Sequence, residues 1–222
     1  MRIGNFKLGI GTPLSFPMIP SAFFDSFIQM EKPDYYYLRS SFGPVDDMRN
    51  FIVKQAIAAG CTHLIMMDTD QIYDVKTIPK LLSHKLPVVG CLVYRRYPPF
   101  DPLMLKGKIH EYKTISEWEP DSLVEVDATG TGCLMFNMEV FRKMPSPWFK
   151  FRKSRGSTVG EDIGFCSDLR EAGYKIFVDT SIPAGHLSNM VVNDGTWKLY
   201  RRLKEAESQY NMEHGILITK EN

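Results

Sequence analysis

The stretch Thr62–Asp70, which reads THLIMMDTD, is the strongest indication of the fold class of this chain. Its continuous apolar run is typical of a strand in a sheet that is covered on both faces. Apolar residues recur at helical spacing before the run, over 44–59, and after it, over 75–83. Two aspartates end the run, and side chains at positions i and i+2 of an extended chain point to the same side. We therefore expect a buried strand with two carboxylates at its end.

Apolar runs and helical patterns alternate through the whole first half of the chain. Strands are expected over 7–11, 34–38, 62–67 and 87–93, with helices over 21–30, 44–59 and 75–83. This order predicts an α/β domain whose Rossmann-like sheet is mostly parallel and flanked by helices.

The pattern changes after Tyr94, where a Pro- and Arg-rich loop begins. Beyond it we expect strands over 108–118, 123–127 and 130–136, a loop over 145–159, a helix over 160–173, a short strand over 175–178 and a last helix over 194–210. No Gly/Ser-rich linker divides the chain. The sequence thus predicts a single domain over residues 1–212 with a small antiparallel second half, and a flexible C-terminal end over 213–222.

Composition excludes several classes of protein. Apolar residues make up 44% of the 222 residues, which is usual for a globular domain and rules out a disordered chain. Lys and Arg number 27 against 26 Asp and Glu, so the whole surface does not suit a polyanion, although a local basic patch remains open. No apolar run is long enough to span a bilayer, and the N-terminus lacks an apolar signal core. We expect a cytoplasmic protein without a transmembrane segment.

The four cysteines lie at least thirty residues apart and among apolar neighbours. Without a Cys-x-x-Cys pair, a zinc site or a redox motif is not indicated. We expect free buried thiols in a reducing compartment.

Asp68 and Asp70 would stand at the carboxyl end of the sheet, where ligands bind in open α/β folds. Two carboxylates at one strand end can hold a hard cation such as Mg²⁺ or Mn²⁺, and such a cation neutralises a diphosphate. A strand-end turn followed by a helix cap is the other interpretation of the same residues.

Three further motifs lie in the second half of the chain. Glu161 and Asp162 open a helix, where acidic residues also favour the positive end of the helix dipole. His186 follows Gly185 and is either a ligand or a hydrogen-bonded loop histidine. The glycines Gly130 and Gly132 permit a close approach of the backbone to a ligand, or mark a bend in a strand.

Taken in this order, the motifs resemble the glycosyltransferases of the GT-A fold, especially the broad family-2-like group. The resemblance spans roughly residues 5–190. The residues that carry it are Gly11-Thr12-Pro13, Arg49-Asn50, the stretch 62–70, the stretch 130–135, Gly160-Glu161-Asp162 and Gly185-His186.

The resemblance implies a hexosyl- or related transferase that moves a sugar from a nucleoside-diphosphate sugar to an acceptor hydroxyl, using Mn²⁺ or Mg²⁺. It implies Asp70 and His186 as metal ligands, Asp68 as a contact of the ribose or the metal, and Asp162, with Glu161 beside it, as the catalytic base. Residues 1–93 would bind the nucleotide, and residues 94–212 the sugar and the acceptor. The residues expected to bind the nucleotide sugar are Thr12, Pro13, Arg49, Asp68, Asp70 and Gly132.

The sequence departs from the family pattern at the end of the second strand. Many members carry there an acid that reads uracil, whereas this chain has Leu38-Arg39-Ser40. The nucleoside is therefore open.

The acceptor is open as well. Saccharides and lipid-linked saccharides are typical of the family, and modified DNA is a third hypothesis. It is motivated by the stretch 148–156, which holds three aromatic and four cationic residues. That stretch is either a lid or grip for an anionic acceptor, or a solvated loop.

Two alternatives from other classes are kept. A sugar-phosphate nucleotidyltransferase would also have a glycine-rich turn after its first strand, but Gly11-Thr12 is followed by Pro13-Leu14-Ser15 without the expected cation. A domain that binds nucleotide or glycan without turnover is compatible with the whole sequence. A dinucleotide dehydrogenase is weaker, because Leu14 stands where the third glycine of its fingerprint would be.

Overall fold

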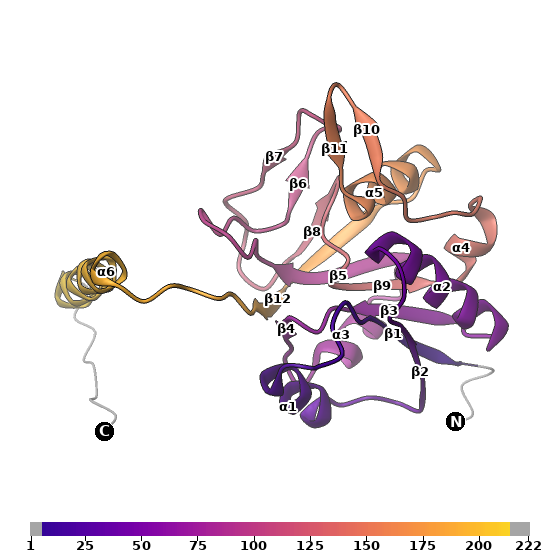
Figure 1. The fold of residues 1–222 in the computed structure, drawn as a ribbon, viewed down its shortest axis with the longest axis horizontal. Coiled ribbons are helices and arrows are strands. Elements are labelled where there is room, and N and C mark those ends of the chain that lie inside the picture. The colour runs from indigo at the N-terminus through magenta and orange to yellow at the C-terminus, as the bar shows by residue number, and fades with distance from the viewer. Residues whose placement is uncertain (1–5, 214–222) are drawn as a thin grey trace. The chain divides into compact units, whose positions relative to one another are not determined.

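The computed structural model describes residues 6–213, which form two compact units. The first unit ends at Leu187 and contains strands β1 to β12 and helices α1 to α5 (Figure 1). The second begins at Ser188 and contains helix α6. The single domain expected over residues 1–212 stays a prediction, and residues 214–222 of the expected flexible end lie outside the described residues.

An eight-stranded sheet forms the centre of the first unit. Its order is β2-β1-β3-β9-β5-β12-β4, and β8 also pairs with β12. β1 pairs in parallel with β2 and β3, β5 pairs in parallel with β12, and β9 lies antiparallel between β3 and β5. β2, β1, β3, β5 and β12 therefore point the same way, which confirms the predicted α/β class. The bounds are β1 (Leu8–Pro13), β2 (Tyr35–Ser40), β3 (His63–Met67), β4 (Gln71–Ile72), β5 (Val88–Val93), β8 (Leu123–Val126), β9 (Cys133–Asn137) and β12 (Ile176–His186).

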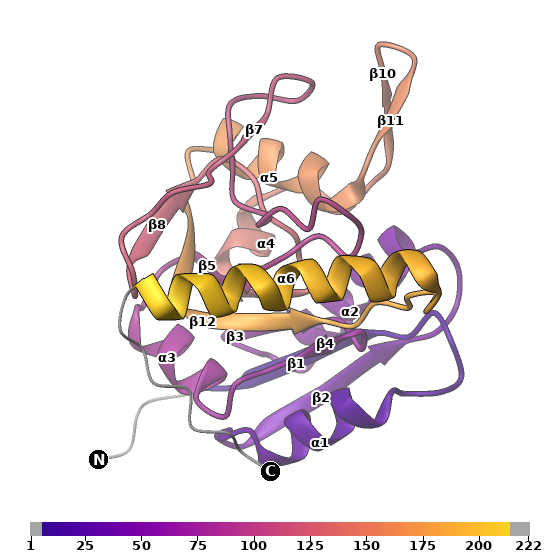
Figure 2. The ribbon, with the colours of Figure 1, turned by 90° about the vertical axis from the view of Figure 1, so that its left-hand side faces the viewer.

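Helices cover both faces of this sheet (Figure 2). One core contains buried side chains of α2, α4 and α5, and the other contains those of α1 and α3. β3 contributes Leu64 and Met66 to the first core, and Ile65 and Met67 to the second. This alternation explains why the run is apolar at every position. The helices are α1 (Ser21–Gln29), α2 (Val45–Ala58), α3 (Thr77–Ser83), α4 (Glu139–Lys143) and α5 (Glu161–Glu171).

Helix α2 forms where its sequence signals place it. Pro44 precedes its first residue, Asp46 and Asp47 lie in its first turn, and Gly60 follows its end with φ +68°. Proline and acidic residues favour a helix start, and a glycine with positive φ favours a helix end. Arg49 is thereby held on the buried side of α2.

The prediction of a loop over 145–159 was wrong in part, because this segment contains a hairpin of β10 (Arg152–Ser154) and β11 (Ser157–Val159). Arg155 and Gly156 form its turn with φ +48° and +76°. Two consecutive positive φ values match the tight turn that hairpins prefer. Arginine is rarely found in that conformation. Of the two turn positions, only Gly156 therefore carries a residue type that is typical of such a turn.

Two other strands differ from expectation. Within 108–118 only β7 (Lys113–Thr114) is extended, paired with β6 (Leu105–Lys106). β12 extends over eleven residues instead of the expected 175–178, because a register shift between Asp179 and Pro183 lets the strand continue past the proline.

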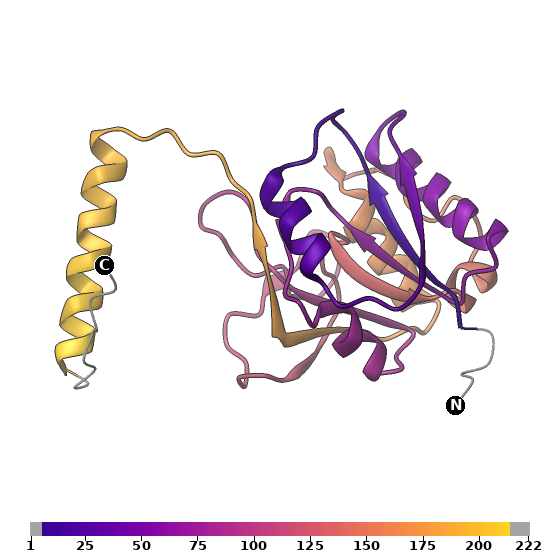
Figure 3. The same ribbon diagram turned by 90° about the horizontal axis from the view of Figure 1, so that it is seen from below.

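The second unit consists of a short segment without regular structure and helix α6 (Asp194–Glu213), which is continuous along its length (Figure 3). Asn193 precedes the helix, and its side-chain oxygen accepts hydrogen bonds from the backbone N–H groups of Gly195 and Thr196. This arrangement is a typical N-cap, and it confirms the helix predicted over 194–210. No helix within residues 6–213 has the length and apolar character needed to cross a membrane.

Candidate functional site

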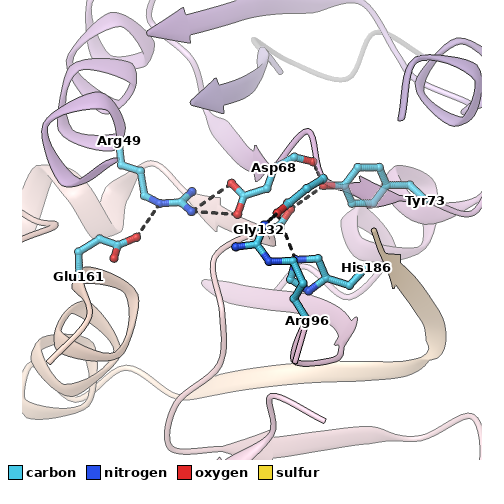
Figure 4. A network of polar contacts seen from close by, with 8 residues as sticks. Arg49, Asp68, Tyr73, Arg96, Gly132, Glu161 and His186 are labelled. Atoms are coloured by element: carbon cyan, nitrogen blue, oxygen red, sulfur yellow. Dashed lines mark hydrogen bonds and ion pairs between the residues drawn. The ribbon is translucent and has the colours of Figure 1, made fainter. Parts of the chain in front are cut away.

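The sequence pair Asp68 and Asp70 lies in a turn between β3 and β4. The expectation that an extended chain points both carboxylates to the same side is corrected: Asp68 is turned toward Arg49 (Figure 4). Asp70 instead contacts His186. A turn forms here because β4 reverses direction to pair antiparallel with the end of β12. That pairing brings Gln71 opposite His186, so the turn and the histidine meet.

Gly132 closes the turn from the opposite side. The backbone N–H of Asp68 donates to the Gly132 carbonyl at 2.9 Å, and the Tyr73 hydroxyl lies 2.7 Å from the carbonyl oxygens of both residues. A Cβ on Gly132 would lie 2.1 Å from Nε2 of Gln71 and 3.0 Å from Oδ2 of Asp68. Any larger residue would therefore push against the acidic turn.

Asp70 and His186 form a pair at the edge of the site. Oδ2 of Asp70 lies 3.3 Å from Nε2 of His186, and Nδ1 of His186 lies 2.7 Å from the carbonyl oxygen of Tyr94. A carbonyl only accepts, so Nδ1 carries the proton and Nε2 faces the carboxylate. This contact with Asp70 raises the pKa of His186 despite its burial. Burial would raise the pKa of Asp70, but His186 and the Arg96 guanidinium at 2.9 Å outweigh it and lower that pKa.

Arg49 joins the acidic turn to helix α5. Its Nη2 donates to both carboxylate oxygens of Asp68 at 3.0 and 3.1 Å, and its Nε donates to Oε1 of Glu161 at 3.1 Å (Figure 4). The guanidinium is buried, and its Nη1 has no hydrogen-bond partner among the described residues. Burial alone would lower its pKa, but the charges of Asp68 and Glu161 raise it above the ordinary value. Arg49 therefore stays charged and neutralises these carboxylates.

Asp162 differs from Glu161, because it forms no ion pair with Arg49 within residues 6–213 and feels its charge only at longer range. Its Oδ1 accepts a hydrogen bond from the Ile163 backbone N–H at 2.7 Å. Burial, and next the negative charge of Glu161, raise the pKa of Asp162 to about 6. A carboxyl group that titrates close to neutral pH is suited to exchanging protons.

The segment Gly130–Gly132 connects the two acidic groups. A Cβ on Gly130 would lie 4.0 Å from Oδ2 of Asp162, and one on Gly132 would lie 3.0 Å from Oδ2 of Asp68. Because glycine has no side chain, the space between each of these glycines and its neighbouring carboxylate is not filled by a Cβ.

A cavity of about 530 Å³ adjoins the acidic turn. Pro13 lines it, whereas Thr12 is fully buried and does not. Its wall combines the turn and Arg96 with a mostly apolar segment after β1. The lining residues are Pro13, Ser15, Phe16, Met18, Ile19, Pro20, Val45, Asp68, Thr69, Asp70 and Arg96.

The similarity of this chain to known proteins is found in its structure and not in its sequence. No protein-family model matches this sequence, and no curated protein matches it either. Among solved structures, A197 from STIV superposes with a TM-score of 0.56 and 17% identity, over 85% of this chain and 97% of that one. GalNAc-T7 with UDP, GalNAc and Mn²⁺ superposes with a TM-score of 0.53 and 11% identity, over 82% of this chain and 44% of that one. The fold is GT-A-like. The chain spans less than half of the GalNAc-T7 chain.

Within this GT-A-like fold, the predicted residues gather in two groups. Asp70 and His186 meet at one side, and Arg49 draws Asp68 and Glu161 together at the other. Within residues 6–213, no cluster of three or more His, Cys, Asp or Glu side chains could bind a metal by itself. Sequence reasoning did not identify Tyr73, which follows the acidic turn and bears no motif, and it placed Arg96 only within the Pro- and Arg-rich loop after Tyr94.

Proposed function

We propose that this chain is a metal-dependent glycosyltransferase that transfers a sugar from a nucleoside-diphosphate sugar to an acceptor hydroxyl. The observation that carries the proposal is the presence of two acidic groups, Asp70 with His186 and Asp162, in a GT-A-like fold whose glycine segment adjoins Asp162 and Asp68. The fold alone is compatible with several activities, so the proposal depends on these residues.

The donor atoms suit a divalent cation that a diphosphate also binds. Asp70 offers a hard carboxylate oxygen, and Nε2 of His186 faces it at 3.3 Å. The proton on Nδ1 is held by the Tyr94 carbonyl, as is usual for a histidine that binds a metal. Mg²⁺ is commonly held by one or two carboxylates together with substrate phosphates, so two protein ligands are sufficient. When bound, such a cation would stabilise the negative charge that develops on the leaving diphosphate.

Asp162 is the base that we assign to the acceptor. Glu161, the other candidate, is held by Arg49, whereas Asp162 has a pKa of about 6 and is mostly ionised at neutral pH. Asp162 would take the proton of the acceptor hydroxyl as its oxygen forms the new bond to the sugar. Arg49 would act as a positioning residue, because it fixes Asp68 and Glu161 relative to one another.

The 530 Å³ cavity is the proposed donor site, with Pro13 and the apolar segment after β1 against the nucleoside. Arg96 pairs with Asp70 in this structure, and it would contact the diphosphate of a bound donor. Arg39 at the end of β2 lines a neighbouring cavity with Ser15 and Phe16. A guanidinium donates hydrogen bonds and does not accept them. Arg39 therefore cannot accept a hydrogen bond from the N–H group of a uracil base, and this position does not favour uracil.

The test is release of nucleoside diphosphate from a panel of UDP-, GDP-, CDP-, ADP- and dTDP-sugars, with Mn²⁺ and with EDTA. We expect release from one nucleoside class with Mn²⁺, and loss of that release in Asp70→Asn. Asp74→Asn is the matched control, since Asp74 lies near the same turn but is exposed, and its carboxylate accepts only a local bond from the Lys76 N–H in the described contacts. Tight nucleotide binding without any release would instead indicate a binding domain.

A further inference from the structure

Cys91 and Cys133 face each other across two neighbouring strands of the sheet. In the antiparallel pair of β5 and β9, Gly90 lies opposite Leu134, and the next position of the same register sets Cys91 opposite Cys133. Their Sγ atoms are unbonded and 2.8 Å apart, which is closer than two unbonded sulfur atoms normally pack. Each residue is 1% exposed, so the two thiols meet inside the core that α1 and α3 cover.

The backbone at this position suits a covalent bond. Residues directly opposite in an antiparallel pair have Cα atoms about 4.5 or 5.5 Å apart, and disulfides span about 4.4–6.8 Å. Gly90 allows β9 to approach closely, because a Cβ there would lie 2.8 Å from the Cys133 carbonyl oxygen. The two side chains point to the same face, into the same core.

We propose that Cys91 and Cys133 form a disulfide that links β5 to β9. The two thiols lose two protons and two electrons as one S–S bond forms between them. A small-molecule disulfide such as oxidised glutathione takes up these protons and electrons, and its own S–S bond splits to give two thiols. This inference goes beyond the proposed function and does not depend on it. It departs from the free thiols that the sequence led us to expect at these two positions.

The other two cysteines do not have such a partner in the described structure. Cys61 and Cys166 belong to the opposite core, and the Cys166 thiol donates to the Thr129 carbonyl at 3.5 Å. Oxidation is therefore expected to be selective for one pair of the four thiols.

The bond would form while the chain folds and would then be protected. Burial raises the pKa of the Cys91 thiol, so the reactive thiolate is rare once the core has closed. A reductant in turn reaches the sulfurs only when the sheet opens. The oxidised protein should resist glutathione in its native state and lose the bond after unfolding.

The link would also stiffen the candidate site. Cys133 directly follows Gly132, whose carbonyl receives the N–H of Asp68, and Cys91 precedes the loop that carries Arg96. Joining positions 42 residues apart restricts the unfolded chain. For a domain of this size we expect the oxidised protein to melt about 5–10 °C above the reduced one.

The test counts thiols in the full chain purified without reductant and treated with oxidised glutathione during refolding. Alkylation with N-ethylmaleimide in denaturant should add two groups to the monomer rather than four, and tryptic peptides should join Cys91 to Cys133. After reduction, all four cysteines should be alkylated. Four modified thiols before reduction, or a bond between any other pair, would overturn the proposal.

Serine variants provide the matched controls. Cys61→Ser and Cys166→Ser remove equally buried thiols, and each should retain the bond and leave one thiol for alkylation. Cys91→Ser and Cys133→Ser should each leave three. The wild-type count needs no variant, so the proposal stays testable even where a substitution prevents folding.

Discussion

Arg49 contacts two carboxylates in an almost fully buried position, so its removal would leave unpaired charges inside the protein. Replacing it by methionine would deprive Glu161 and Asp68 of their cation. Breaking a buried ion pair by removing one partner typically costs about 3–5 kcal/mol, because the remaining charge is not compensated. We predict a loss of that size for Arg49→Met in urea unfolding.

A double-mutant cycle separates this effect from lost packing. Arg49→Met combined with Glu161→Gln should recover part of the loss, since the uncharged glutamine no longer needs a cation. Arg39→Met, on the exposed side of β2, should change stability by no more than about 0.5 kcal/mol. A cost at Arg49 no larger than at Arg39 would show that the network does not stabilise the fold.

Asp162 is the residue to which we assign the proton transfer. Asp162→Asn should lower the turnover number by about 10²–10⁴-fold and leave nucleotide affinity unchanged, because the residue acts on the acceptor rather than on the donor. Glu171→Gln, on the exposed part of the same helix, should leave both quantities unchanged.

The pH profile provides a second readout for Asp162. A base must be ionised, so wild-type activity should rise with pH and reach half of its limit at about 6, the raised pKa of this carboxyl. An activity that is flat between pH 5 and 8 would mean that another group receives the proton.

Among the secondary-structure elements, strand β3 was predictable because every residue of its apolar run packs in one of two cores. Helix α2 was predictable because proline and acidic residues mark its start and glycine marks its end. The hairpin β10–β11 was not, since Arg155 holds a conformation that its side chain does not signal. Nor was the length of β12, because a register shift, which is a property of the paired sheet, lets it pass Pro183.

Asp179, at the register shift of β12, contacts His84 at the C-terminal end of helix α3. Its Oδ2 lies 2.7 Å from Nε2 of His84, and Oδ1 accepts the Ser181 N–H at 2.9 Å. Burial would raise the pKa of Asp179, but these hydrogen bonds outweigh it and lower the pKa below its ordinary 3.8. A depressed pKa in the folded state means that the stabilisation is present above the ordinary value and is lost as the pH falls through the folded value.

We predict that Asp179→Asn costs about 1.5–3 kcal/mol at pH 7, the usual size for hydrogen bonds to a charged group. The difference from wild type should persist to about pH 5 and shrink below the ordinary pKa of 3.8. Urea unfolding at a series of pH values measures it. A difference that grows on acidification would be inconsistent with the assigned direction of the pKa.

For the molecule as a whole, the order of the motifs predicted the fold class, and the structure brought some of the motifs into contact. Asp70 and His186 are 116 residues apart in the sequence, and Arg49 and Glu161 are 112 apart. The resemblance implied a nucleotide-binding role for Arg49, which stays a prediction, and the contacts of Arg49 in the structure are two carboxylates of the same chain. Such pairings depend on which strands are neighbours, and the position of β9 between β3 and β5 is not readable from local patterns.

Asp70 and His186 are proposed to hold a divalent cation together with a nucleoside diphosphate, and the proposed function rests above all on this pair. Calorimetric titration of UDP, GDP, CDP, ADP and dTDP into the protein, with Mn²⁺ and with EDTA, measures that binding without an acceptor. We predict that one nucleotide binds with Mn²⁺, and that EDTA, Asp70→Asn or His186→Gln each weakens it by about 10–100-fold or more, while Asp74→Asn does not. Equal affinity in EDTA, an unaffected Asp70→Asn, or no binding by any of the five would refute the assignment.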